Sequence, residues 1–210
     1  MPFPCLYAII DPAEAGGRPP VEVAATLLEA GVALIQYRSK HRSSREMYED
    51  CRVIQERVRR SSGLFIVNDR ADVARATQAD GVHLGQDDLP IEQARRVLAP
   101  QQWIGCSTHS FEQVVEADQT SADYIAFGPI FPTASKENPD PVVGLAGLSR
   151  ARRATAKPLV AIGGITLQNA REVLAAGADS VAVIGDLLNA PDLRARAQDF
   201  LSFLGTLEHR

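Results

Sequence analysis

The stretch LFIVNDRADVARATQADGVHL, from Leu64 to Leu84, contains the pattern that decides the fold. It opens with a short apolar run at Leu64 to Asn68 and closes with a second one at Gly81 to Leu84, and the residues between them are typical of a helix. Two short strands joined by a helix form a crossover that makes them parallel neighbours. The stretch therefore predicts one βαβ unit.

The same alternation continues along the whole chain, which has 210 residues. Eight runs have strand character: Leu6 to Ile10, Ala33 to Arg38, Leu64 to Asn68, Gly81 to Leu84, Trp103 to Ser107, Tyr124 to Gly128, Leu159 to Gly163 and Ser180 to Ile184. Eight units favour closure into a barrel over an open doubly wound sheet. We therefore expect the α/β class and a single (β/α)8 TIM-barrel domain over residues 1–210, with no visible linker.

A local repeat places Ala-Asp just before three of these strands, with Asp80, Asp123 and Asp179 as the acidic residues. Each aspartate then lies where a helix leads into the N-terminal end of a strand. That end of a β/α barrel serves stability more than chemistry. We therefore expect these three carboxylates to lie outside the functional site.

Bulk composition limits the partners and the compartment. A net charge of -4 gives no general attraction for nucleic acid or an acidic membrane surface, so we expect small-molecule partners and local anion binding. The three cysteines form no Cys-x-x-Cys pair, and no targeting segment or run of transmembrane length is evident. A cytoplasmic protein fits these features, and a homo-oligomer is possible.

Basic residues extend the second strand, in the run LIQYRSK. The two-residue period of a strand directs Gln36, Arg38 and Lys40 to one face, and Ile35 and Tyr37 toward the helices. An inward-facing cation needs a carboxylate or a phosphate as a partner, and a diphosphate would satisfy both Arg38 and Lys40. The alternative is a solvated basic run.

Acidic residues follow the next two strands. Asp69 and Asp88 would lie on adjacent strand ends, where a pair of carboxylates suits Mg2+ bridged to substrate phosphates. The alternative is that Asp69 caps a helix and Asp88 begins a turn before Pro90. For His83 we expect a hydrogen-bonded core position without a catalytic role.

Hydroxyl groups and glycines occupy the remaining strand ends. Ser107 follows the fifth strand and could bind phosphate, whereas the role of His109 stays open. After the sixth strand, the loop that carries Thr133, Ser135 and Lys136 is long enough to be a binding loop. After the seventh strand, the paired glycines Gly163-Gly164 allow backbone N–H groups to approach a phosphate. The loops after the last two strands of a barrel often form a phosphate-binding site.

Taken in order, these motifs resemble the thiamine phosphate synthase family over nearly the whole chain. The motifs are QYRSK at 36–40, VNDR at 67–70, GQDD at 85–88, STH at 107–109, GPIFPT at 128–133 with Lys136, and IGGI at 162–165. The resemblance implies that a hydroxymethylpyrimidine diphosphate and a thiazole phosphate are joined to give thiamine phosphate and diphosphate. It implies a dissociative substitution through a pyrimidine carbocation, which needs no deprotonating base. No paired nucleophile and base is evident in the sequence.

The resemblance also implies roles for individual residues. Asp69 and Asp88 would hold Mg2+. The implied catalytic residues are Arg38, Lys40, Ser107 and Lys136. The implied substrate-binding residues are Gln36, Tyr37, Arg38, Ser39, Lys40, Asn68, Ser107, Thr133, Ala134, Ser135, Lys136, Gly164, Ile184 and Gly185.

Within that set, Thr133, Ser135, Gly164, Ile184 and Gly185 would receive the thiazole phosphate. The pyrimidine diphosphate would be held by Gln36, Arg38, Lys40, Asn68 and Lys136, with help from Ser107. Two positions depart from the family pattern: Ser135 stands where a second Thr is usual, and Gly185 where a phosphate-binding Ser is usual. Gly185 brings no hydroxyl, so backbone N–H groups would have to serve there.

Two other functions stay open. One is the related thiazole tautomerase, which can share the phosphate-binding half and a His after the fifth strand, as His109 is here. The other is a catalytically silent phosphate-binding barrel that acts as a regulator, because a fold alone does not establish turnover.

Overall fold

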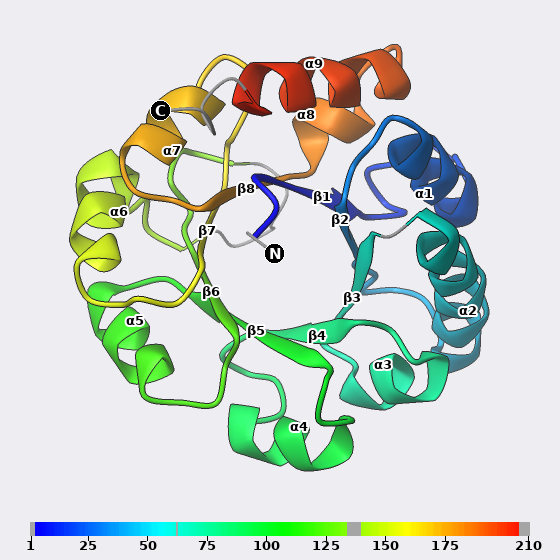
Figure 1. Cartoon of the computed structure of the whole chain (residues 1–210), viewed down its shortest axis with the longest axis horizontal. Coiled ribbons are helices and arrows are strands. Elements are labelled where there is room, and N and C mark those ends of the chain that lie inside the picture. The colour runs from blue at the N-terminus through cyan, green and yellow to red at the C-terminus, as the bar shows by residue number, and fades with distance from the viewer. Residues whose placement is uncertain (1–2, 62, 134–139, 206–210) are drawn as a thin grey trace.

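The protein is a closed barrel of eight parallel strands (Figure 1) in the computed structural model, which describes residues 3–61, 63–133 and 140–205. Each strand pairs with its sequence neighbours, and β1 pairs with β8 to close the barrel. The strands are β1 Leu6–Ile10, β2 Leu34–Tyr37, β3 Leu64–Asn68, β4 Gly81–Leu84, β5 Trp103–Thr108, β6 Tyr124–Phe127, β7 Leu159–Ile162 and β8 Ser180–Val183. The predicted (β/α)8 fold is confirmed, with strand ends that differ by no more than one residue.

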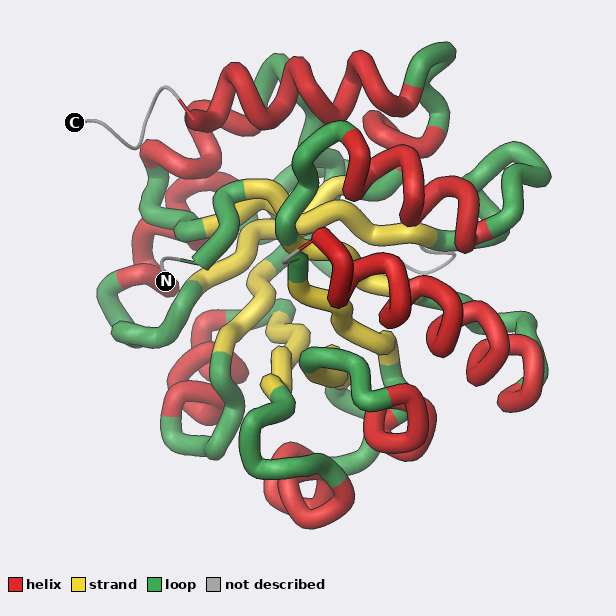
Figure 2. The backbone as a smooth tube through the Cα atoms, turned by 45° about the vertical axis from the view of Figure 1, so that its right-hand side comes forward, coloured by secondary structure: helices red, strands yellow, loops and turns green. Residues whose placement is uncertain are grey.

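Helices form a ring around the strands (Figures 1 and 2). In the described part of the chain they are α1 Pro20–Glu29, α2 Ser44–Ser61, α3 Ala71–Thr77, α4 Ile91–Val97, α5 Phe111–Asp118, α6 Gly144–Arg152, α7 Ala170–Ala175, α8 Gly185–Leu188 and α9 Leu193–Gly205. The short α8 follows β8 directly and precedes α9. None of the helices described here is long and apolar enough to cross a membrane.

Alternation along each strand separates two apolar clusters. The outer cluster packs the barrel against the helices and includes Ile35 and Tyr37 of β2. The inner cluster fills the lower barrel and includes Leu34 of the same strand, together with Tyr7 and Tyr124. Because side chains alternate with a period of two, Gln36 shares the inner face with Leu34.

Helix α2 follows the second strand. Its apolar face, which consists of Met47, Cys51, Ile54 and Val58, is buried against the barrel. The spacing of these residues follows the helical repeat, so the face is also visible in the sequence.

The Ala-Asp repeat forms three equivalent clamps at the N-terminal ends of the strands. Each aspartate donates its backbone N–H to a carbonyl of the preceding strand, and its Oδ2 accepts the backbone N–H of that same residue. The pairs are Asp80 with Phe65, Asp123 with Ile104, and Asp179 with Leu159, at 2.7 or 2.8 Å throughout. None of the three aspartates lines the cavity described below, as expected.

Candidate active site

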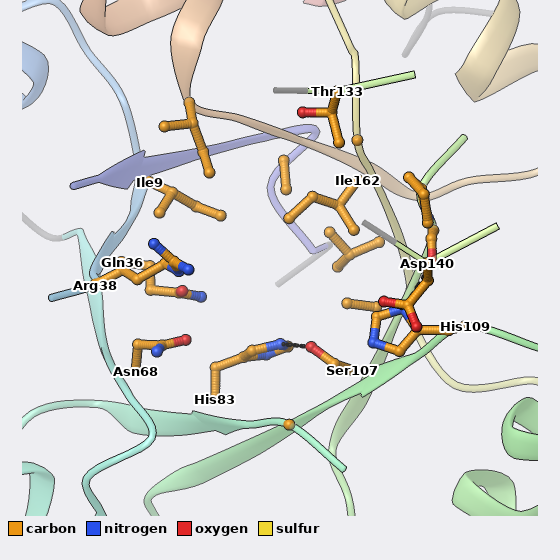
Figure 3. Close-up of a pocket in the computed structure, with 18 of the residues that line it drawn as sticks. Ile9, Gln36, Arg38, Asn68, His83, Ser107, His109, Thr133, Asp140 and Ile162 are labelled. Atoms are coloured by element: carbon orange, nitrogen blue, oxygen red, sulfur yellow. Dashed lines mark hydrogen bonds and ion pairs between the residues drawn. The ribbon is translucent and has the colours of Figure 1, made fainter. Parts of the chain in front are cut away.

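A cavity of about 870 Å³ opens at the C-terminal ends of the strands. Residues from all eight strands or the loops that follow them line it, and Figure 3 shows several of them converging on the open space. Its volume falls in the upper range of small-molecule sites. The polar strand ends identified in the sequence therefore meet in one place.

One wall of the cavity, which we call the basic wall, is formed by Gln36, Arg38 and Lys40, and nearby carboxylates balance its positive charge. Arg38 forms an ion pair with Asp11, a buried residue just after β1. The ammonium of Lys40 lies 2.5 Å from the Asp69 carboxylate. Both side chains line the cavity, and Gln36 lies deeper on the same wall (Figure 3). No local sequence pattern marks Asp11, since its distance in sequence from Arg38 hides the pairing.

Two residues of the implied substrate-binding set lie away from the cavity lining. The Tyr37 hydroxyl donates a hydrogen bond to Asp50 on α2, 2.9 Å away, which agrees with the strand alternation. The Ser39 hydroxyl accepts the backbone N–H of Arg42. Both side chains thus form hydrogen bonds behind the basic wall, outside the cavity.

The two predicted metal ligands come together beside Lys40. Asp69 has a left-handed backbone (φ 62°), which Asp tolerates better than most residues, and Asp88 accepts the Gly85 N–H at 2.7 Å. Burial, followed by the adjacent hydrogen-bonded Asp69, raises the pKa of the Asp88 carboxyl. Within residues 3–61, 63–133 and 140–205, no group of three or more His, Cys, Asp or Glu side chains is arranged to hold a metal ion.

Both aspartates differ from their local alternatives. Arg70, and not Asp69, is the N-cap residue of α3. Asp88 ends a turn that starts at Gly85 and does not begin one before Pro90, and it lines the cavity at the same time.

A chain of hydrogen bonds crosses the barrel under the cavity. Gln36 Nε2 donates to the Tyr7 hydroxyl (2.7 Å), which contacts the Tyr124 hydroxyl (2.8 Å). The Tyr124 hydroxyl meets His83 Nδ1 (3.0 Å), and His83 Nε2 meets the Ser107 hydroxyl (2.8 Å; Figure 3). Burial raises the pKa of both tyrosines, so their phenols stay neutral.

His83 and Ser107 correct one expectation. The sequence showed no paired nucleophile and base, but the fold brings these two side chains within hydrogen-bond distance. The group behind His83 is the neutral phenol of Tyr124, whereas a nucleophilic triad uses a carboxylate that stabilises the imidazolium. Among the described residues, the pair therefore does not show the carboxylate–imidazole arrangement that activates a serine. His83 is a buried, hydrogen-bonded residue as expected, and it also lines the cavity.

The opposite wall is built from the loops after β6, β7 and β8. Gly163 and Gly164 have positive φ values of 99° and 63°. A Cβ at Gly164 would lie 2.5 Å from the Pro132 carbonyl oxygen, so the close contact between the two loops requires glycine. Thr133, Gly164, Ile184 and Gly185 line this wall, and Gly185 begins α8.

Three predicted site residues, Ala134, Ser135 and Lys136, lie outside the described residues. Asn68 lines the cavity between the basic wall and His83 (Figure 3). His109 also lines it, with Nδ1 donating to the Gly128 carbonyl (2.7 Å) and lying 3.5 Å from the Asp140 carboxylate. His109 is thus tied to the loop after β6.

Fold and site together define a small (β/α)8-barrel enzyme whose cavity joins a basic wall to a glycine-rich wall. The family model described as thiamine monophosphate synthase matches residues 6–187. The chain therefore belongs to the thiamine monophosphate synthase family, whose activity is that of a transferase.

Individual relatives agree with this family. The thiamine-phosphate synthase of Koribacter versatilis is 50% identical over 206 residues, which cover 96% of each chain. That of Methanospirillum hungatei is 43% identical, with 95% of this chain and 97% of the relative covered. The solved structure of thiamine phosphate pyrophosphorylase from Pyrococcus furiosus is 40% identical, covers 96% of each chain and superposes with a TM-score of 0.88.

Proposed function

We propose that this protein joins a hydroxymethylpyrimidine diphosphate to a thiazole phosphate, giving thiamine phosphate and diphosphate as a step of thiamine biosynthesis. The observation that carries the proposal is one cavity with two walls of different chemistry. The basic wall after β2 suits a diphosphate, and the glycine-rich wall at β7 and β8 suits a single phosphate. Family membership supports the same substrates.

In this proposal the basic wall handles the diphosphate. Arg38 and Lys40 supply positive charge, and Asn68 and Ser107 supply hydrogen bonds. Lys136 is proposed to add a further cation from the loop after β6. These groups stabilise the negative charge that develops as the diphosphate departs, which is the largest contribution expected of such a site.

Mg2+ is proposed to bind between Asp69 and Asp88. The fit is supported by two neighbouring carboxylates, which offer only oxygen ligands. Burial, followed by the adjacent Asp69, raises the pKa of Asp88, so a cation at this pair is favourable, and Lys40 already lies against Asp69. When bound, the ion would neutralise charge on the diphosphate. Its remaining ligands would be water and phosphate oxygens, as is usual for Mg2+.

The glycine-rich wall is proposed to hold the thiazole phosphate. Thr133 offers a hydroxyl, and Gly164 and Gly185 allow the backbone to come close. Ser135 and Ala134 belong to the same proposed half. Because Gly185 brings no hydroxyl, the phosphate would rely on backbone N–H groups at the start of α8.

The thiazole nitrogen already carries the lone pair that forms the new bond, so the residues of the site need only orient it toward the pyrimidine methylene carbon. This agrees with a His83–Ser107 pair in which the Nδ1 of His83 meets the neutral phenol of Tyr124. We further propose that the whole chain, residues 1–210, works as one domain in the cytoplasm. A homo-oligomer stays a prediction.

The test is an assay with magnesium and both phosphorylated precursors, which should yield thiamine phosphate and diphosphate. No turnover with verified substrates would contradict the proposal. Isomerisation of a thiazole carboxylate phosphate would instead support the tautomerase alternative. Phosphate binding without turnover of either kind would leave a regulatory barrel.

A further inference from the structure

The hydrogen-bonded chain under the cavity has a definite order. It runs from Gln36 on β2 through Tyr7 on β1, Tyr124 on β6 and His83 on β4 to Ser107 on β5. Its two ends, Gln36 and Ser107, both lie at the cavity wall (Figure 3). The three residues between them form a relay, which we define as Tyr7, Tyr124 and His83.

The number of protons that each residue can donate links Gln36, on one side of the relay, to Ser107, on the other. A phenol has one proton to donate, and both tyrosines are buried, so a proton left without an acceptor would be costly. Gln36 donates to Tyr7, and Tyr7 must therefore donate to Tyr124. Tyr124 must in turn donate to His83 Nδ1.

His83 then carries its proton on Nε2 and donates it to the Ser107 oxygen. Two consequences follow at the cavity wall. One N–H of the Gln36 amide donates to Tyr7, which fixes the orientation of the amide and leaves its oxygen as an acceptor for a ligand at the cavity wall. The Ser107 proton is available to a ligand, because its oxygen already accepts from His83.

We propose that Tyr7, Tyr124 and His83 are positioning residues that set the hydrogen-bonding polarity of the cavity wall, which means that Gln36 acts as an acceptor and Ser107 as a donor. The relay thereby selects a pyrimidine with an exocyclic amino group over its oxo counterpart. An aminopyrimidine offers an amino donor and a ring-nitrogen acceptor, which complement an acceptor at Gln36 and a donor at Ser107. An oxopyrimidine offers the reverse pattern. The inference rests on the proposed function, which makes a pyrimidine the ligand of this wall.

The backbone at Gly105 leaves room for this relay. A Cβ there would lie 2.1 Å from Tyr124 Cζ and 2.5 Å from His83 Nδ1. Real Cβ atoms do not approach other atoms so closely, so any larger residue would displace the two rings. The rings also stack, with their centroids 5.6 Å apart.

The kinetic test compares Tyr7→Phe and Tyr124→Phe with the wild type. For each enzyme, kcat/KM is measured with the aminopyrimidine diphosphate and with its oxo analogue. We expect the preference for the amino compound to fall at least about tenfold in both variants, since each loses a hydrogen bond that fixes the polarity. Tyr48→Phe is the control: Tyr48 lies exposed on α2 and should keep the wild-type ratio.

The spectroscopic test needs no turnover. In the ligand-free wild type, 15N chemical shifts of the His83 ring should show the tautomer protonated at Nε2. A tautomer protonated at Nδ1, or a substrate preference within about threefold of wild type in both Phe variants, would overturn the proposal. Absence of any turnover by the wild type would instead contradict the proposed function, and the His83 tautomer would still decide the polarity of the relay.

Discussion

The clamp at Asp123 allows a prediction that separates stability from catalysis. Asp123 Oδ2 accepts the N–H of Ile104 at 2.7 Å and pairs with Arg95 at 2.6 Å. Asp123→Ala leaves the N–H of a buried strand residue without its acceptor, which costs about 1–3 kcal/mol. The ion pair adds little, about 0–1 kcal/mol, since the Asp123 side chain is 40% exposed.

We therefore expect Asp123→Ala to lower the free energy of unfolding by about 2 kcal/mol, or the melting temperature by about 4–8 °C for a chain of this length. Asp123→Asn keeps an oxygen acceptor and should lose less than about 1 kcal/mol. Urea unfolding followed by circular dichroism measures both changes. Because the clamp lies at the barrel end opposite the cavity, kcat/KM of the folded variants should match the wild type. An unchanged unfolding midpoint in the Ala variant, or lost turnover at unchanged stability, would refute the reasoning.

Further predictions concern the site and the thiols. Asp69→Ala should lower magnesium-dependent kcat/KM by about a hundredfold or more, because even outer-shell partners of a metal contribute 10–100-fold; near-normal rates with a normal circular dichroism spectrum would remove Asp69 from the metal site. Lys136→Ala should raise KM for the pyrimidine diphosphate and lower kcat, and wild-type values would place that side chain in solvent. Burial raises the pKa of the Cys51 thiol, so little thiolate forms at pH 8 and its alkylation, located by mass spectrometry of peptides, should require unfolding. Rapid labelling of Cys51 itself in the native protein would contradict this.

Local patterns explain what could be predicted from the sequence. The eight strands, α2 and the position of the Ala-Asp repeat before three strands all depend on residues a few positions apart, whose spacing is visible in the chain. The alternation at Gln36, Arg38 and Lys40 predicted one inward face because a strand repeats every two residues. All three residues line the cavity.

Long-range partners explain what was missed. The Tyr7 and Tyr124 hydroxyls meet across 117 residues, and Arg38 and Asp11 across 27. No local pattern marks such pairs, since each depends on the register of the closed barrel. The nearest signal was a tyrosine on the inner face of the otherwise apolar β1, where a buried hydroxyl needs a partner.

The three clamps also bear on how the chain reaches its fold. Each joins an aspartate to a strand only 15, 19 or 20 residues earlier, so a single βαβ segment contains both halves of the contact. The loop entropy of such a contact is small compared with that of the β1–β8 pairing, which joins Leu6 to Val181. A single βαβ segment therefore contains all it needs to form such a contact, whereas the ring closes only when β8 pairs with β1.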